Sequence, residues 1–211
     1  MEFWEERFQK EGKIWGESPS PSADIAAKFF MENSAVKVLV PGCGYGRNSE
    51  KLALEGFRVF GMDISKTAIE MAKKSSEEKN LRIRYFLGSV LEMPFEEDEF
   101  DGIFCFNVLH LFSKQERMRM MLEINSVLKP MGIAAFVVFS EQDFSYGKGE
   151  EVEKNTFESR KGRIAHYFTK EDLEEYFQGY EILENKVIEE AEDHDEGPHV
   201  HELRLIAAKK K

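Results

Sequence analysis

Three glycines and one aspartate follow two apolar runs that have the length of strands. The stretch VKVLVPGCGYGRNSEKLALEGFRVFGMDIS, residues 36–65, places Gly42, Gly44 and Gly46 after the first run and Asp63 at the end of the second. Glycines there let backbone N–H groups approach a ligand at a helix N-terminus, and they tolerate positive φ. A carboxylate at the end of the neighbouring strand can accept both hydroxyls of a ribose. The pattern therefore favours an adenosine-containing cofactor over a plain glycine turn beside a surface acid.

The spacing of the glycines separates two kinds of cofactor. The dinucleotide fingerprint is G-x-G-x-x-G, and its third glycine stands where the helix packs closely on the strand. Counted from Gly42, Arg47 holds that third place, and the pattern here is G-x-G-x-G. A large arginine where a pyrophosphate needs close approach counts against NAD and FAD. The spacing favours a cofactor without phosphates.

The elements that must position these residues alternate between strand-length apolar runs and helical patterns. Strands are predicted over 35–40, 57–62, 81–87, within 99–109 and over 132–140, and helices over 47–56, 65–80 and 113–129. After a helix over 169–179, strands over 180–190 and 199–210 are separated by a break too short for a parallel crossover, so they form an antiparallel hairpin. We therefore expect an α/β fold with a doubly wound, Rossmann-like, seven-stranded sheet that is mostly parallel and has an antiparallel last strand.

Two segments lie outside this core, and we expect a single domain over residues 1–211 that includes both. Residues 1–30 form an N-terminal cap segment, which starts as a short helix and becomes a Pro/Ser-rich loop. An insertion over residues 141–168 has little regular periodicity, and a connection of that length is usually a functional lid or a disordered segment. It follows the fifth strand, so it starts at the carboxyl edge of the sheet, where open α/β folds bind ligands.

Composition and charge narrow the classes of partner. The 211 residues are 42% apolar and 33% charged, with a formal net charge of -11. This acidic balance argues against a nucleic acid or membrane partner, which needs an excess of Lys and Arg on one face. No apolar run reaches bilayer length, the N-terminus is too polar and acidic for a signal peptide, and two cysteines do not suggest a disulfide framework. We therefore expect a cytoplasmic protein.

The sequence resembles the class I S-adenosylmethionine-dependent methyltransferases along nearly its whole length. The segments VLVPGCGYGRNS, VFGMDIS, FLGSVLEMPF and FDGIFCFNVLH look like their first four motifs, and VLKPMGIAAFVVF resembles the passage into their fifth strand. GRNS and the aromatic N-terminal segment look like the tellurite-resistance methyltransferases, and VPGCG is similar to the thiopurine methyltransferase group. The resemblance implies S-adenosyl-L-methionine as methyl donor, S-adenosyl-L-homocysteine as product, a small-molecule acceptor, and a monomer or small homo-oligomer.

By position, the resemblance also implies a set of cofactor contacts. They are Trp15, Gly42, Cys43, Gly44, Arg47, Asp63, Ile64, Ser89, Val90 and Asn107. The glycine loop would pass under the methionyl part, and Asp63 would hold the ribose hydroxyls. Ile64 would pack on the adenine, and Asn107 would lie beneath the methionine moiety.

Three of these positions carry open alternatives. Ser89, with Val90, would meet the adenine edge, but the family often has an acid at the Ser89 position; the Ser89 hydroxyl or the backbone would have to accept from the adenine amine. Arg47 either pairs with the methionine carboxylate or is a solvated first-turn arginine. Trp15 either closes over the sulfonium cation or packs within the N-terminal segment.

Methyl transfer from a sulfonium is an in-line displacement with a neutral leaving group, so the protein mainly has to align the reactants. A thiolate acceptor needs no base, whereas a hydroxyl or amine profits from one. The candidate bases are His199 and His201, which face one side of the last strand, and His166 at the end of the insertion. His194, His199 and His201 are also candidate ligands for a divalent metal. The third interpretation is that these histidines are solvated or only stabilise the hairpin.

These observations favour a methyltransferase that acts on a small-molecule nucleophile. A cofactor-binding or sensor protein of the same fold without catalysis is the alternative, and the glycine loop, Asp63 and the long insertion argue against it. A dinucleotide oxidoreductase is disfavoured by Arg47 at the place of the third glycine. The residue pattern does not select one acceptor.

Overall fold

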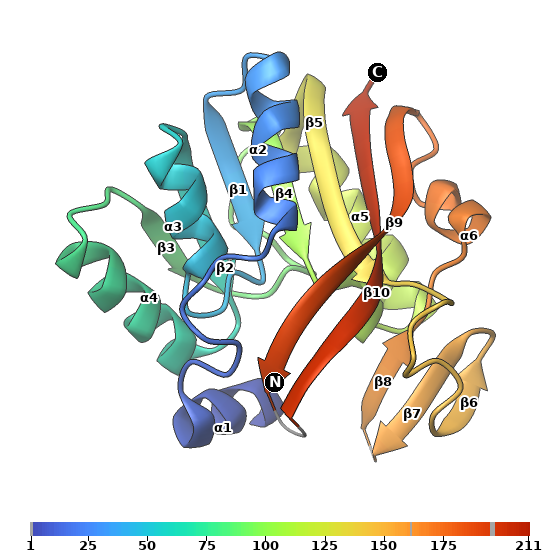
Figure 1. Ribbon diagram of the computed structural model, residues 1–211. Coiled ribbons are helices and arrows are strands. Elements are labelled where there is room, and N and C mark those ends of the chain that lie inside the picture. Colours follow the sequence, from blue (N-terminus) through green and yellow to red (C-terminus); the bar gives the residue numbers. More distant parts are fainter. Residues whose placement is uncertain (1, 161, 195–196) are drawn as a thin grey trace.

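The computed structural model describes residues 2–160, 162–194 and 197–211 and is built around one seven-stranded sheet (Figure 1). Its strands are β1 (Lys37–Pro41), β2 (Arg58–Asp63), β3 (Arg84–Leu87), β4 (Phe100–Phe106), β5 (Leu128–Phe139), β9 (Tyr180–His194) and β10 (Gly197–Lys210). They follow the order β3-β2-β1-β4-β5-β10-β9, and β10 is antiparallel to both of its neighbours. The expected doubly wound sheet with an antiparallel last strand is confirmed.

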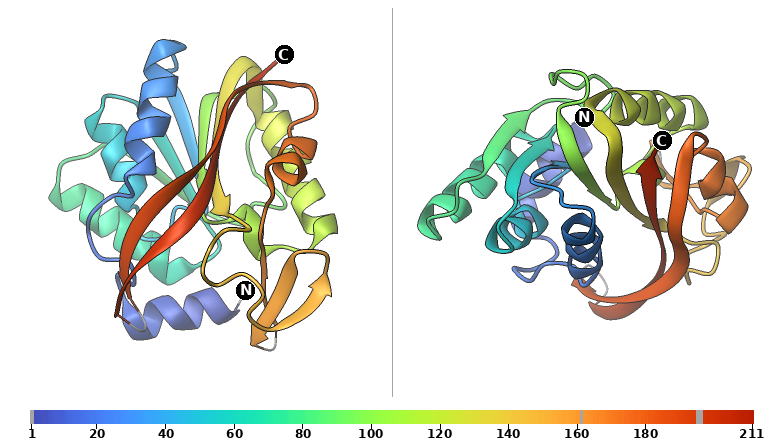
Figure 2. Two further views of the ribbon diagram at one scale, coloured as in Figure 1. Left: turned by 45° about the vertical axis from the view of Figure 1, so that its right-hand side comes forward. Right: turned by 90° about the horizontal axis from the view of Figure 1, so that it is seen from above.

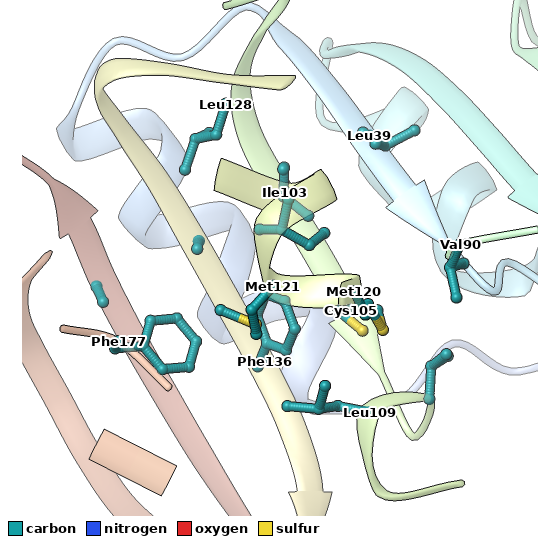
Figure 3. Close-up of a cluster of buried hydrophobic side chains, with 14 of the residues drawn as sticks. Leu39, Val90, Ile103, Cys105, Leu109, Met120, Met121, Leu128, Phe136 and Phe177 are labelled. Carbon is teal, nitrogen blue, oxygen red and sulfur yellow. The ribbon is translucent and has the colours of Figure 1, made fainter. Parts of the chain in front are cut away.

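Helices cover both faces of the sheet, as the right-hand view of Figure 2 shows. On one face lie α2 (Ser22–Glu32), α3 (Arg47–Leu54) and α4 (Lys66–Glu78), and on the other lie α5 (Lys114–Val127) and α6 (Lys170–Glu175). Successive strand residues point to opposite faces. Val38 therefore packs in the cluster of the first helices, whereas Leu39 packs with Met120 of α5 and Phe136 of β5 (Figure 3). Burial on both faces explains why the parallel strands are continuous apolar runs.

The N-terminal cap segment contains more helix than the sequence analysis predicted. After α1 (Glu2–Glu11), residues 22–32 form α2, a helix that was not predicted. The buried residues Ala23, Ala26, Ala27 and Phe30 have the i, i+3, i+4, i+7 spacing of one helix face, and this face packs on β4, β5 and β10. The preceding SPSPS stretch suggested a loop and obscured this short pattern. None of the described helices is long and apolar enough to span a membrane.

The insertion over residues 141–168 forms regular structure despite its weak periodicity. β6 (Glu150–Glu153), β7 (Thr156–Arg160) and β8 (Arg163–His166) pair as a separate antiparallel sheet. Asn155, with φ 58°, makes the turn between β6 and β7. In Figure 1 this small sheet and α1 flank the lower end of the β9–β10 hairpin, toward which the carboxyl ends of β1, β4 and β5 point.

Two strand boundaries differ from the prediction. β5 begins at Leu128 and runs through Pro130, and a register shift against β4 between Phe100 and Gly102 absorbs the residues around that proline. β9 and β10 extend into the predicted break between them, with His199 opposite Glu192. The longer hairpin carries its end beyond the carboxyl edge of the parallel strands, because Leu203 already lies opposite Phe139, the last residue of β5.

Candidate functional site

The glycine loop and Asp63 form one hydrogen-bonded unit at the ends of β1 and β2. Gly42, Gly44 and Gly46 have φ values of 65°, 53° and 91°. The Gly44 N–H donates to Asp63 Oδ2 at 2.8 Å. A Cβ atom on Gly42 would lie 2.3 Å from Val108 Cγ2, so this position also requires glycine for space. The loop backbone is thereby fixed against the carboxylate that follows the neighbouring strand.

Asp63 is a buried carboxylate that can accept a further hydrogen bond. Asp63 is only 7% exposed, and its Oδ1 accepts the Ser65 N–H at 2.9 Å. Burial raises the pKa of Asp63, and the N–H groups of Ser65 and Gly44 oppose that rise. A carboxylate offers about four lone-pair positions; these two bonds use one on each oxygen, and the Ile64 N–H also interacts with the group. A further donor, such as a ribose hydroxyl, therefore fits its hydrogen-bonding capacity.

The cap segment is fastened directly to the glycine loop. Tyr45 Oη donates to Gly16 O at 2.8 Å and accepts the Trp15 N–H at 3.0 Å. The rings of Trp15 and Tyr45 are stacked with centroids 6.3 Å apart. Trp4 and Phe8 of α1 pack on the same aromatic cluster. Trp15 is thus held beside the loop, and its closure over a cofactor stays a prediction.

The surroundings of Arg47 contradict one of the two interpretations predicted for it. Its side chain is only 13% exposed, so it is not a solvated first-turn arginine. Arg47 Nη1 donates to Trp15 O at 3.2 Å and to Ser18 O at 3.0 Å, and Nη2 lies 3.7 Å from Glu192 Oε1. Arg47 therefore ties the cap segment and the hairpin to the first turn of α3. Its pairing with a cofactor carboxylate stays a prediction.

The remaining positions implied for the cofactor lie around the ends of β1, β2 and β3. Cys43 is buried and donates its N–H to Met62 O at 2.9 Å, and burial raises the pKa of its thiol. Gly88 N–H donates to Asp63 O at 2.9 Å, which brings Ser89 beside the end of β2. Ser89 Oγ accepts the Leu91 N–H at 3.2 Å. The other two positions are half-buried Ile64 and buried Val90.

Two buried polar atoms near the end of β4 have no hydrogen-bond partner among the described residues. They are Asn107 Oδ1 and His110 Nδ1. Asn107 has φ 54°, and His110 lies in the 3₁₀ turn η1 (Leu109–Leu111), stacked on Phe139 with centroids 4.1 Å apart. Burial lowers the pKa of His110 to about 3, so its ring is neutral at pH 7. Because buried polar atoms are nearly always paired, both mark positions where a ligand can supply the partner.

His199 and His201 of β10 lie together beyond the end of β5. Their Nε2 atoms are 3.0 Å apart. His201 Nδ1 lies 2.8 Å from Asp143 Oδ2, and His199 Nδ1 lies 2.7 Å from Gly197 O. The predicted placement of the start of this strand at the carboxyl edge is confirmed. The side chain of His194 lies outside the described part of the chain.

His166 is separate from this pair. Its Nδ1 lies 2.7 Å from Thr156 Oγ1 of β7, and its Nε2 lies 2.5 Å from Asp172 Oδ2 of α6. Burial lowers the pKa of His166, and the hydrogen bond to Asp172 opposes that shift. Both ring nitrogens are used to join the small sheet to α6. This arrangement favours a structural role for His166 over the predicted role as a base.

Known proteins resemble this chain in sequence. A family described as a methyltransferase domain matches residues 38–132. The ubiquinone biosynthesis O-methyltransferase of Coxiella burnetii (strain Dugway 5J108-111) is 33% identical over 125 residues, which cover 58% of this chain and 53% of that protein. The corresponding protein of Rickettsia akari (strain Hartford) is 28% identical over 127 residues, 59% of this chain and 49% of that one. The chain spans about half the length of the curated relatives it matches.

Solved structures resemble it over more of its length. A SAM-dependent methyltransferase from Methanosarcina mazei has 25% sequence identity and a TM-score of 0.72, over 82% of this chain and 92% of that one. TehB from Haemophilus influenzae has 22% identity and a TM-score of 0.70, over 99% of this chain and 67% of that one. At that identity the second likeness shows the shared fold.

Proposed function

The chain belongs to the class I S-adenosylmethionine-dependent methyltransferases, and on this premise we propose that it transfers the methyl group of S-adenosylmethionine to a small-molecule nucleophile. The observation that carries the proposal is the buried Asp63 carboxylate, bonded to the Gly44 N–H of the glycine loop. This pair offers an acceptor for ribose hydroxyls beside a backbone that a ligand can approach closely. The matched family region, residues 38–132, contains both residues.

The proposed donor site extends from β2 to the end of β4. Asp63 would hold the ribose hydroxyls, and Ile64 and the Ser89–Val90 edge would hold the adenine. The glycine loop would hold the methionyl part, and Asn107 Oδ1, which has no partner among the described residues, would accept from its ammonium group. Trp15 covers the site from the cap segment. No pyrophosphate has to be held, which agrees with Arg47 at the place of the third glycine.

The proposed chemistry asks little of the protein beyond alignment. The methyl group is already activated on sulfur, and the leaving thioether is neutral, so the protein has to hold acceptor, methyl and sulfur in line. We place the acceptor between the end of β4, with His110, and the start of β10, with His199 and His201. A thiolate attacks directly, and a hydroxyl or amine transfers its proton to a base there. The cap segment and the insertion exclude water.

Calorimetric titration tests the donor. S-adenosylmethionine, S-adenosylhomocysteine and NAD are titrated separately into the metal-stripped chain. We expect the two adenosyl compounds to bind and NAD to bind far more weakly. Asp63→Ala should reduce their affinity on the order of 100-fold, because hydrogen bonds to a charged group contribute about 1.5–3 kcal/mol each. Asp24→Ala, which removes an exposed carboxylate of α2, is the matched control and should leave affinity unchanged. A preference for NAD, or equal binding by Asp63→Ala, would refute the proposed donor site.

Turnover tests the acceptor side. S-adenosylhomocysteine formation is measured with small thiols, amines, hydroxyl compounds, and selenite and tellurite as acceptors. With an active acceptor, His199→Ala should lower kcat more than it lowers the affinity for S-adenosylmethionine, since the histidines lie on the acceptor side of the proposed site. Unchanged turnover in this variant would remove His199 from the reaction. Product formation with no member of the panel, despite donor binding, would instead favour the sensor alternative.

A further inference from the structure

The end of the β9–β10 hairpin gathers three side chains with the donor atoms that transition metals prefer. One ligand atom each from Glu192, His199 and His201 lies within 4.8 Å of the other two. We propose that these residues bind a divalent transition-metal ion of the zinc class. This inference goes beyond methyl transfer and does not depend on it: none of the three residues is a proposed donor contact, although His199 and His201 border the proposed acceptor site and Glu192 lies beside Arg47.

The hairpin register sets this arrangement. His199 lies directly opposite Glu192, so their side chains leave the sheet on the same face. His201 follows two residues along β10 and points to that face as well. The Glu192 side chain is 7% exposed and His201 is 6% exposed. His199 is half-buried, so the three donors converge in a partly buried place.

The hydrogen-bond partners of the two Nδ1 atoms show that these nitrogens carry hydrogens. Gly197 O can only accept, so His199 Nδ1 carries a hydrogen. Asp143 Oδ1 also accepts the Ser145 N–H at 2.9 Å, and its Oδ2 accepts the Glu202 N–H at 3.0 Å, so both oxygens of this carboxylate act as acceptors. His201 Nδ1 therefore donates to this carboxylate. The Nε2 atoms of the two rings then face each other across 3.0 Å.

A shared proton can bridge the two nitrogens alone, and Glu192 Oε1 also lies 3.7 Å from Arg47 Nη2. A metal ion uses all three, and metal-bound histidines characteristically donate their other N–H to a carbonyl or a carboxylate, as these two do. Phe139 and Phe144 add an apolar shell, each with its ring centroid 5.2 Å from that of His201. The geometry thus supplies three ligands, second partners for the two histidines and apolar rings beside one of them.

The donor set identifies the class of ion. Two imidazoles and one carboxylate suit zinc and its neighbours cobalt and nickel, and they suit magnesium and calcium less well, since those ions prefer oxygen ligands alone. Three protein ligands leave a fourth tetrahedral position for water or for an oxygen or sulfur atom of a small molecule. Asp143 takes no part as a ligand and acts through the orientation of His201.

The test uses the full chain without a polyhistidine tag, stripped with a chelator and titrated with Zn²⁺ in a calorimeter and with Co²⁺ in a visible spectrophotometer. We expect one ion per chain, and intense Co²⁺ absorption typical of a tetrahedral site. His199→Ala, His201→Ala and Glu192→Gln should each weaken Zn²⁺ binding at least 100-fold, on the order of the upper effect of second-partner changes. Asp143→Asn should weaken it by about 10- to 100-fold. Glu189→Gln, an exposed carboxylate on the same strand, should change nothing.

The titrations of the unmodified chain keep the test independent of whether a variant folds. Absence of stoichiometric Zn²⁺ binding, or a Co²⁺ spectrum like that of the aqueous ion, would overturn the site and leave the shared proton as the explanation of the histidine pair. Equal loss in Glu189→Gln and Glu192→Gln would do the same. S-adenosylmethionine is then titrated into the stripped chain. Donor binding without Zn²⁺ binding refutes the metal site alone, and the reverse result refutes the donor site alone.

Discussion

At the residue scale, the carboxyl edge depends on backbone conformations that few residue types adopt. Gly42 and Gly44 have positive φ, and so does Asn107 after β4. A non-glycine residue in this region carries a cost, which asparagine tolerates better than most. The three residues lie at the ends of β1 and β4, neighbouring strands whose carboxyl ends meet at one edge.

Substitution tests whether position 42 requires glycine for its positive φ and for space. Gly42→Ala should destabilise the fold by about 1–2 kcal/mol from its positive φ and by about 1–3 kcal/mol more from the contact with Val108. Gly12→Ala is the matched control, because Gly12 has φ 68° but nothing within 4 Å of an added Cβ. Chemical denaturation measures both free energies of unfolding, and adding Val108→Ala should recover part of the loss. Equal losses at Gly42 and Gly12 would exclude the steric contribution.

At the scale of elements, one carboxylate docks α1 onto the start of α4. Glu5 accepts Ser65 Oγ–H at 2.7 Å and Thr67 Oγ1–H at 2.6 Å. Ser65 also caps α4 by accepting the Ala68 N–H at 3.1 Å. The same loop carries Asp63, so α1 rests on the residues that follow the proposed ribose site. Hydrogen bonds from Thr67 and Ser65 lower the pKa of Glu5 from 4.5 to about 2.

This docking predicts an acid transition that the tryptophans report. Because the pKa of Glu5 is lowered in the folded state, its stabilising contribution is complete above pH 4.5 and is lost as the pH falls toward 2. The only two tryptophans, Trp4 and Trp15, both lie in the cap segment, so their fluorescence follows its docking. Glu5→Ala should shift the emission to the red already at neutral pH. Glu6→Ala, which changes an exposed neighbour, should have the same emission as the unmodified chain. The same red shift in that variant would show that the hydrogen bonds of Glu5 are not what docks α1.

At the scale of the whole molecule, the β9–β10 hairpin joins the two segments outside the core. Glu190 of β9 accepts the Ser22 N–H of the cap segment at 2.9 Å. His201 of β10 bonds Asp143, at the start of the insertion. The Phe139 ring, at the end of β5, stacks with His110, Tyr167 and His201. The cap segment, the insertion and the central sheet therefore share one network around the proposed acceptor site.

His110, in this stack, should make the stability of the whole molecule depend on pH. Its pKa is lowered from 6.5 to about 3, so below pH 6.5 the unfolded chain binds a proton that the folded chain does not. This contribution should reduce the free energy of unfolding by on the order of 1.4 kcal/mol per pH unit as the pH falls below 6.5. His110→Phe, which keeps a ring on Phe139, should remove that slope in urea denaturation between pH 7.5 and 5. Parallel stability curves for the two chains would contradict a neutral buried His110.

The features that depend on short-range patterns could be predicted from the amino-acid order alone. Alternating runs predicted the parallel sheet, and the length of the break before Gly197 required the antiparallel hairpin, because a parallel crossover needs more residues. The glycine loop and Asp63 were found for a similar reason, since consecutive strands of such a sheet end at one edge. The helix α2 was also encoded locally, by the spacing of Ala23, Ala26, Ala27 and Phe30, although the proline-rich stretch before it concealed the pattern.

Contacts between side chains that are distant in the sequence could not be predicted in this way. The register of the hairpin brings Glu192 opposite His199, so a carboxylate joins the two histidines as a metal-ligand candidate that the sequence analysis did not name. The partners of Arg47 come from the cap segment and from β9, and packing alone leaves His110 Nδ1 buried without a partner among the described residues. Residue spacing along one strand fixes which face of the sheet a side chain occupies. Its contacts depend on the register of the neighbouring strand and on the elements that pack against that face.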